Sequence, residues 1–166
     1  MIACKDIRWF VMDVDGTLTD GRIYMGPEGE VFKAFNIKDG YAIHEMLPQM
    51  GIEPVIITAR HSKIVERRCD ELGVSRVYQG VKTKLLLLEQ LLDEAGLSLH
   101  NVAYIGDDVN DLPVMQAVIQ AGGLALCPGD AAAEVRSQCK YVSKCPGGFG
   151  SVRECVEWLR ARRLER

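Results

Sequence analysis

The sequence lacks any apolar run long enough to cross a membrane. A membrane-spanning helix needs about 20 predominantly apolar residues, whereas the leucine run Leu85–Leu88 ends at Glu89. The N-terminal residues also lack the apolar stretch of a secretory signal peptide, because Lys5, Asp6 and Arg8 interrupt it. We therefore expect neither membrane contact nor export.

Cysteine pairs and an excess of one charge are also missing. The six cysteines include no Cys-x-x-Cys pair and no zinc-like His/Cys spacing. We therefore expect reduced thiols and a cytoplasmic location. Twenty Lys and Arg residues stand against 23 Asp and Glu residues, a formal net charge of −3 that argues against a general nucleic-acid binder.

The chain has 166 residues, 48% of them hydrophobic, which is typical of one globular domain over residues 1–166. Short, strongly apolar segments alternate with helical patterns, and Gly51, Gly73, Gly96 and Gly122 each follow a helical pattern, as helix-ending glycines do. The pattern predicts an α/β fold, a Rossmann-like doubly wound parallel sheet with helices on both faces. The expected strands are Ile7–Val14, Pro54–Thr58, Arg76–Tyr78, Val102–Gly106 and Leu124–Cys127. The expected helices are Gly40–Met50, Ser62–Leu72, Thr83–Ala95 and Leu112–Ala121, with a further one from near Phe149.

The segment Gly21–Asn36 breaks this alternation. Two strand-like runs, Arg22–Met25 and Glu30–Phe35, flank a loop of two glycines, a proline and a glutamate. This pattern predicts a β-hairpin flap directly after the first strand.

Acidic side chains follow two of the expected strands. Asp13 and Asp15 close the first strand, and alternation places both on the same side, with Gly16 permitting a sharp turn after them. In an open α/β sheet, ligands bind beyond the carboxyl ends of the strands. Two carboxylates there need a countercharge, and hard oxygen ligands favour Mg²⁺.

A second acidic group, Asp107-Asp108-Val109-Asn110-Asp111, follows the strand that ends near Gly106. Helix capping by Asn110 or Asp111 explains one of its four polar side chains at best. The surplus predicts that Asp107, and with it Asp111, faces the same cation as Asp13. Thr58 ends another strand and Lys84 opens a helix, positions from which both can bind phosphate oxygens, although each residue has a simpler surface or packing interpretation when taken alone.

Together these segments resemble the haloacid dehalogenase superfamily. The four motifs are Asp13-Val14-Asp15-Gly16-Thr17, Thr58, Lys84 and Gly106-Asp107-Asp108-x-x-Asp111, in the order and spacing of that superfamily. Receiver domains of response regulators also cluster Asp, Thr and Lys at strand ends. Their phosphate-accepting Asp lies between the first acidic pair and the Thr, where this chain has no strand-end Asp.

The hairpin, and the short connection from Gly51 to Pro54, resemble the subclass that has no cap domain and contains phosphatases of 3-deoxy-2-keto sugar acid phosphates. The resemblance implies hydrolysis of 3-deoxy-D-manno-octulosonate 8-phosphate, a lipopolysaccharide precursor, by a homotetramer. Thr17 and Ala59 depart from the subfamily pattern, which has Val and Gly there. A nine-carbon keto sugar acid 9-phosphate is the alternative substrate, and a non-catalytic oligomerisation module is the alternative function.

The resemblance also implies a role for each site residue. Asp13 is the nucleophile that forms an aspartyl phosphate, and Asp15 is the general acid and base. Mg²⁺ binds Asp13, the main-chain carbonyl of Asp15, and Asp107. Thr58 and Lys84 hold the phosphoryl oxygens, Asp108 and Asp111 orient Lys84 or metal-bound water, and the substrate contacts are Arg60, Thr17, Gly147 and Gly148.

Overall fold

A six-stranded parallel sheet forms the centre of the computed structural model, which describes residues 4–164. The strand order is β5-β4-β1-β6-β7-β8, and every pairing is parallel. The strands are β1 (Trp9–Met12), β4 (Glu53–Ile57), β5 (Arg76–Tyr78), β6 (Val102–Ile105), β7 (Leu124–Cys127) and β8 (Tyr141–Val142). The five predicted strands are therefore confirmed. The short strand β8 was not predicted.

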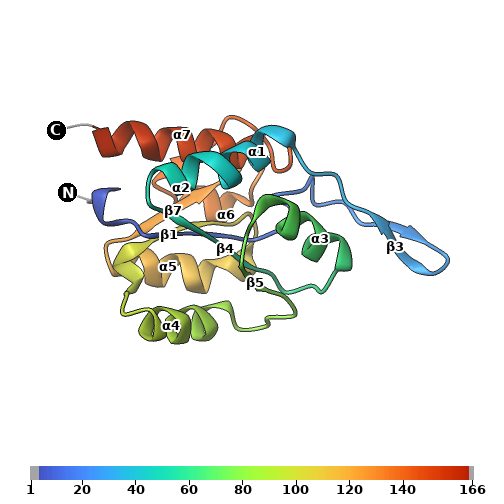
Figure 1. Ribbon diagram of the computed structural model, residues 1–166, viewed down its shortest axis with the longest axis horizontal. Helices are drawn as coiled ribbons and strands as arrows, with labels where there is room; N and C mark the ends of the chain where they lie inside the picture. Colours follow the sequence, from blue (N-terminus) through green and yellow to red (C-terminus); the bar gives the residue numbers. More distant parts are fainter. Residues whose placement is uncertain (1–3, 165–166) are drawn as a thin grey trace.

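Helices cover both faces of this sheet (Figure 1). One face carries α1 (Ile37–Tyr41), α2 (Leu47–Gln49), α3 (Lys63–Leu72) and α7 (Ser151–Leu164), and the other carries α4 (Lys84–Glu94), α5 (Leu112–Gln120) and α6 (Ala133–Arg136). Strand β1 serves both cores, because Phe10 and Met12 pack toward α7 whereas Trp9 and Val11 pack toward α4 and α5. This two-sided burial confirms the predicted doubly wound fold.

Local sequence signals account for most helix ends. Asn36 begins α1 earlier than predicted, because its side chain accepts a hydrogen bond from the Lys38 N–H at 2.8 Å. A π-helical segment, Ala42–Met46, joins α1 to α2 just before Pro48, whose missing N–H disturbs regular helical bonding. The four glycines predicted to end helices all have positive φ angles. Short 3₁₀ turns at Cys4–Asp6, Leu99–Asn101 and Val109–Asp111 complete the helical elements.

The predicted β-hairpin consists of β2 (Tyr24–Gly26) and β3 (Gly29–Phe32), paired antiparallel. It projects from the body of the molecule, at the end opposite both termini (Figure 1). The Tyr24 and Phe32 rings stack with centroids 4.2 Å apart. No cap domain is inserted between the described elements, as predicted, so the hairpin is the one projecting feature near the carboxyl ends of the strands.

No helix within residues 4–164 is long and apolar enough to cross a membrane.

Candidate active site

The predicted site residues meet at the carboxyl ends of β1, β4 and β6. Asp13 follows β1, Thr58 follows β4, and Asp107 follows β6 after one glycine. They border a cleft of about 260 Å³. Its lining residues are Asp13, Asp15, Gly21, Thr58, Ala59, Arg60, Asp107, Asp108 and Asn110. The structure thus brings together side chains that lie up to 97 positions apart, from Asp13 to Asn110.

Lys84 is a buried cation behind this cleft. Its Nζ lies 2.8 Å from Asp13 Oδ1 and 2.7 Å from Asp111 Oδ1. Burial alone would lower the pKa of Lys84, but the charges of Asp13 and Asp111 outweigh it and the pKa is raised. Lys84 therefore stays charged.

Asp111 holds Lys84 in place rather than facing the cleft. Its Oδ1 also accepts a hydrogen bond from the Tyr104 hydroxyl at 2.7 Å, and its Oδ2 accepts one from the Asp107 N–H at 3.1 Å. Asp111 is completely buried. Because every one of these bonds is internal, Asp111 fits the predicted orienting role.

Asp13 is buried and Asp107 is partly buried, and their carboxyl groups lie close together at the cleft. Burial, followed by the charge of Asp111, raises the pKa of Asp13 from 3.8 to about 6. Burial, followed by the charges of Asp13 and Asp111, raises the pKa of Asp107 to about 7. One carboxylate oxygen from each of Asp13, Asp107 and Asp111 lies within 4.8 Å of the others, a spacing that fits a metal ion. A divalent cation would relieve the repulsion, and the all-oxygen donor set suits Mg²⁺.

Gly16 permits the close approach of two loops, the first acidic loop after β1, which carries Asp13 and Asp15, and the second acidic loop after β6, which carries Asp107. Its φ is +91°, and a Cβ there would lie 2.0 Å from Asp107 Oδ2. The next residue, Thr17, is fully buried, and its hydroxyl donates to Asp107 Oδ1 at 3.2 Å. The structure therefore places the Thr17 side chain against Asp107, which it orients, instead of in the cleft where the predicted substrate contact would lie.

Asp15 is held apart from the acidic group. Lys33 Nζ bonds to Asp15 Oδ1, and Arg60 Nε lies 3.9 Å from Oδ2. The metal-compatible cluster accordingly takes its third carboxylate from Asp111, not from Asp15. The sequence prediction for Asp15 concerned its main-chain carbonyl and stays a prediction.

Three other predicted site residues have structural partners. Asp108 caps the 3₁₀ turn Val109–Asp111 by accepting from the Val109 N–H at 2.8 Å. Asp111, one of the two expected capping residues, is at the N-cap position of α5, but its side chain makes no capping bond to that helix. The Gly147 N–H donates to Asp130 Oδ1 at 2.8 Å, and the Gly148 N–H donates to the Thr17 carbonyl at 3.2 Å. The Gly148 bond thus joins the loop before α7 to the loop that carries Asp15, whereas the Gly147 bond joins it to the loop after β7.

Sequence reasoning missed several residues of the site. Tyr104 lies inside a buried strand, where a tyrosine first suggests packing, yet its hydroxyl bonds to Asp111. Glu30 and Lys33 belong to the hairpin segment, and the fold brings Glu30 to Arg60 and Lys33 to Asp15, with Lys33 Nζ 2.9 Å from Glu30 Oε1. Lys33 belongs to a segment that resembles the subfamily, Lys33-Ala34-Phe35-Asn36, but the resemblance gave neither Lys33 nor Glu30 a role in the site.

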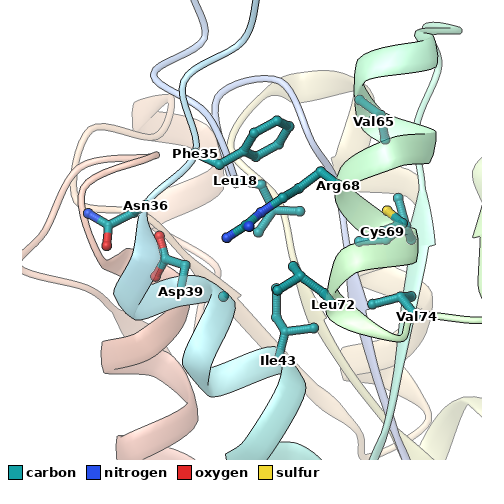
Figure 2. A pocket seen from close by; sticks show the side chains of 12 residues that line it. Leu18, Phe35, Asn36, Asp39, Ile43, Val65, Arg68, Cys69, Leu72 and Val74 are labelled. Carbon is teal, nitrogen blue, oxygen red and sulfur yellow. The ribbon is translucent and has the colours of Figure 1, made fainter.

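A second cavity, of about 10 Å³, lies between α1 and α3 (Figure 2). Arg68 enters it beside Phe35 and Leu18, and its guanidinium lies 5.9 Å from the centre of the Phe35 ring. The volume is that of about one water molecule. This cavity is therefore a packing feature at the base of the hairpin and cannot hold a substrate.

Fold and site together define a hydrolase of the haloacid dehalogenase type. The sequence profile of "haloacid dehalogenase-like hydrolase" matches residues 41–118. The parallel sheet, the acidic residues after β1 and β6, and the lysine at the start of α4 are the parts that this class requires.

Relatives narrow the class. The chain is 44% identical over 159 residues to the 3-deoxy-D-manno-octulosonate 8-phosphate phosphatase KdsC of Escherichia coli (strain B / BL21-DE3), covering 96% of this chain and 82% of the relative. A crystal structure of such a phosphatase from Moraxella catarrhalis, in complex with magnesium ion, phosphate ion and KDO, matches with a TM-score of 0.87 and 38% identity over 96% of this chain and 88% of that one. The cobalt-bound form of the Haemophilus influenzae phosphatase matches with a TM-score of 0.88 and 32% identity, over 97% of this chain and 91% of that one. The chain belongs to this family of phosphatases.

Proposed function

We propose that this protein hydrolyses the phosphate ester of 3-deoxy-D-manno-octulosonate 8-phosphate, a step toward lipopolysaccharide. The observation that carries the proposal is the assembly of Asp13 and Asp107 in one cleft, with the buried Lys84 behind it bonded to Asp13, in a chain whose relatives carry that activity in their names. A non-catalytic oligomerisation module has no need of a buried lysine between two carboxylates, since such a group is costly to bury.

Asp13 is the proposed nucleophile. Lys84 engages its Oδ1, which leaves Oδ2 for attack on phosphorus. The new bond from Asp13 to phosphorus forms as the bond from phosphorus to the sugar oxygen breaks, giving an aspartyl phosphate and the free sugar acid. Thr58 borders the same cleft, where its hydroxyl and Lys84 would hold the phosphoryl oxygens.

Asp15 is the proposed proton donor and acceptor. It gives a proton to the departing sugar oxygen and then takes one from the water that hydrolyses the aspartyl phosphate, releasing inorganic phosphate. Its carboxyl group lines the cleft and is partly exposed, so both the sugar oxygen and water can reach it.

Asp13 and Asp107 are the side chains that would hold Mg²⁺, with the main-chain carbonyl of Asp15 as a further proposed ligand. The bound ion would supply positive charge that offsets the repulsion between the Asp13 carboxylate and the phosphate. The raised pKa values of Asp13 and Asp107 indicate how strongly that charge is needed.

Arg60 is the proposed contact for the substrate carboxylate. It borders the cleft and is 43% exposed, and its ion pairs with Asp15 and Glu30 are long, at 3.9 and 3.5 Å. A guanidinium with loose internal partners can rebind to an incoming carboxylate, which it matches in a bidentate manner. Arg60 also favours the eight-carbon acid over the nine-carbon alternative, because phosphatases of the nine-carbon acids often carry Glu at this place.

A homotetramer and a cytoplasmic location complete the proposal. Ile23, Met25, Val31 and Phe32 of the hairpin are 43–63% exposed, which is more apolar surface than a small projection usually leaves in water. Contact between hairpins of neighbouring subunits would cover it. The cytoplasmic location rests on the sequence, whose cysteines form no Cys-x-x-Cys pair.

A substrate panel tests the proposed function. Phosphate release with Mg²⁺ is measured for the eight-carbon 8-phosphate, for nine-carbon keto sugar acid 9-phosphates and for p-nitrophenyl phosphate. We expect the highest kcat/KM for the eight-carbon substrate. A higher value for a nine-carbon substrate would transfer the assignment to that acid. No turnover of any phosphomonoester would favour the alternative function, a non-catalytic oligomerisation module.

A further inference from the structure

A buried lysine from the hairpin segment contacts the proposed acid–base residue. Lys33 lies one residue beyond β3, and its side chain is 1% exposed. Its ammonium bonds to Oδ1 of Asp15 and lies 2.9 Å from Glu30 Oε1. An ammonium taken out of water is costly unless it is paired, so this placement calls for a function.

We propose that Lys33 is a positioning residue for the phosphatase reaction: it holds Oδ1 of Asp15, so that Oδ2 is the oxygen that faces the leaving group. The proposal rests on the proposed function, since it assumes that Asp15 gives a proton to the departing oxygen. It adds a residue outside all four motifs of the sequence to the machinery of the site.

The contacts of Asp15 favour this role for Lys33 over any other neighbour. Arg60 Nε is 3.9 Å from Oδ2, beyond hydrogen-bond distance, and the Arg60 side chain is 43% exposed. Such an exposed, long ion pair restrains a carboxylate weakly. Lys33 is therefore the contact that fixes the rotation of the Asp15 carboxyl group, and Oδ2 is left on the side of Arg60 and the cleft.

Lys33 is itself anchored to the rigid part of the fold. Glu30, its second partner, accepts a hydrogen bond from the hydroxyl of Ser62, the residue that caps the N-terminus of α3. Asp15, Lys33, Glu30 and Ser62 thus form one continuous set of contacts from the first acidic loop to a helix packed on the sheet. A general acid needs this kind of restraint, because proton transfer depends on the position of one oxygen relative to the leaving group.

A purely structural role, in which Lys33 only fastens the hairpin to the body, makes a different prediction. Loss of a fastening would lower the turnover of all substrates alike. Loss of a positioned acid would lower turnover most where the leaving group needs a proton, and least where it departs readily as an anion.

The test compares two aryl phosphates, phenyl phosphate and 2,4-dinitrophenyl phosphate, which carry no carboxylate and so avoid Arg60. Phenolate is the poorer leaving group and depends more on a proton from Asp15. The variants are Lys33→Gln, Lys33→Arg and, as a control, Lys140→Met at an exposed lysine that lines no part of the cleft. Competitive inhibition by inorganic phosphate and the thermal midpoint are measured alongside.

We expect Lys33→Gln to lower the ratio of kcat for phenyl phosphate to kcat for the dinitrophenyl ester about tenfold or more, within the range that general acid catalysis contributes. Inhibition by inorganic phosphate should change less than threefold, and Lys140→Met should match the wild type. If Lys33→Gln fails to fold, Lys33→Arg keeps the charge but displaces it, and the same ratio should fall.

A ratio within twofold of the wild type in a folded Lys33 variant would overturn the proposal. A wild-type protein that hydrolyses neither ester and not the sugar acid phosphate would instead overturn the proposed function. The two failures are thus separate.

Discussion

At the scale of single residues, the stability of the metal-free site depends on pH through Asp107. Its pKa is raised from 3.8 to about 7, chiefly by burial and then by Asp13 and Asp111. Between these values the folded state keeps a proton that the unfolded state has lost, so stability falls as pH rises through this window. Below the lower value and above the upper value, Asp107 contributes no further change.

Asp107→Asn should remove this dependence. Measured in chelator, the thermal midpoint of Asp107→Asn relative to the wild type should rise progressively from about pH 4 to about pH 7 and then level off. Asp93→Asn, at an exposed carboxylate of α4, is the matched control and should give a flat difference. A flat difference for Asp107→Asn as well would mean that the fold does not raise the pKa of the Asp107 carboxyl group.

Arg60 gives a second prediction at this scale. Arg60→Ala should lower kcat/KM for the sugar acid phosphate by about 10- to 100-fold, the scale of a charged hydrogen bond left without its partner. It should scarcely change p-nitrophenyl phosphate hydrolysis, because that ester has no carboxylate. Equal losses on both substrates would mean that Arg60 contacts the phosphate or acts through Asp15, and does not bind the substrate carboxylate.

At the scale of elements, the loop before α7 must pack directly on the first acidic loop. A Cβ at Gly147 would lie 1.8 Å from the Gly16 carbonyl oxygen, a distance that only displaced backbone can relieve. Gly147→Ala should therefore lower kcat about tenfold or more by shifting the loop that carries Asp15.

Gly96→Ala is the control for this prediction. Gly96 has a φ of +65° and no atom within 4 Å of its added Cβ. It should lower stability by about 1–2 kcal/mol through backbone strain alone, leaving kcat unchanged. Steady-state kinetics and thermal unfolding separate the two effects, and an unchanged kcat in Gly147→Ala would contradict the close packing of the two loops.

The sequence carried most of the elements that form this site, because each has a local signal. The buried strands are continuous apolar segments, and glycines mark the ends of the helices between them. Strand β8 and helix α6 gave no such signal, being two and four residues long. The four motif segments were predictable as a group, but Lys33 and Tyr104 were not, since their roles arise from contacts 18 and 7 positions along the chain, with Asp15 and Asp111.

At the scale of the whole molecule, the hairpin is a small projection (Figure 1). Its side chains Ile23, Met25, Val31 and Phe32 are apolar and exposed. An isolated two-stranded hairpin is marginally stable in water. Packing between hairpins would bury Ile23 and Phe32 and would help to exclude water from a cleft that has no cap domain.

Light scattering after size-exclusion chromatography tests the assembly. We expect a mass near four times 18.4 kDa. The double variant Ile23→Asp with Phe32→Asp should lower both the mass and the activity on the sugar acid phosphate, whereas Leu86→Asp, at a 65% exposed leucine of α4, should lower neither. A fully active wild-type monomer would refute the tetramer.

The central claim is that Asp13 performs the chemistry in a cleft that needs Mg²⁺. The direct measurement is phosphate release from 3-deoxy-D-manno-octulosonate 8-phosphate by the wild type and by Asp13→Asn, each with Mg²⁺ and with chelator. We predict turnover only for the wild type with Mg²⁺. We also predict that Asp13→Asn folds, because the substitution removes one charge from a crowded acidic site. If Asp13→Asn kept more than about a hundredth of the wild-type rate, a covalent role for Asp13 would be untenable.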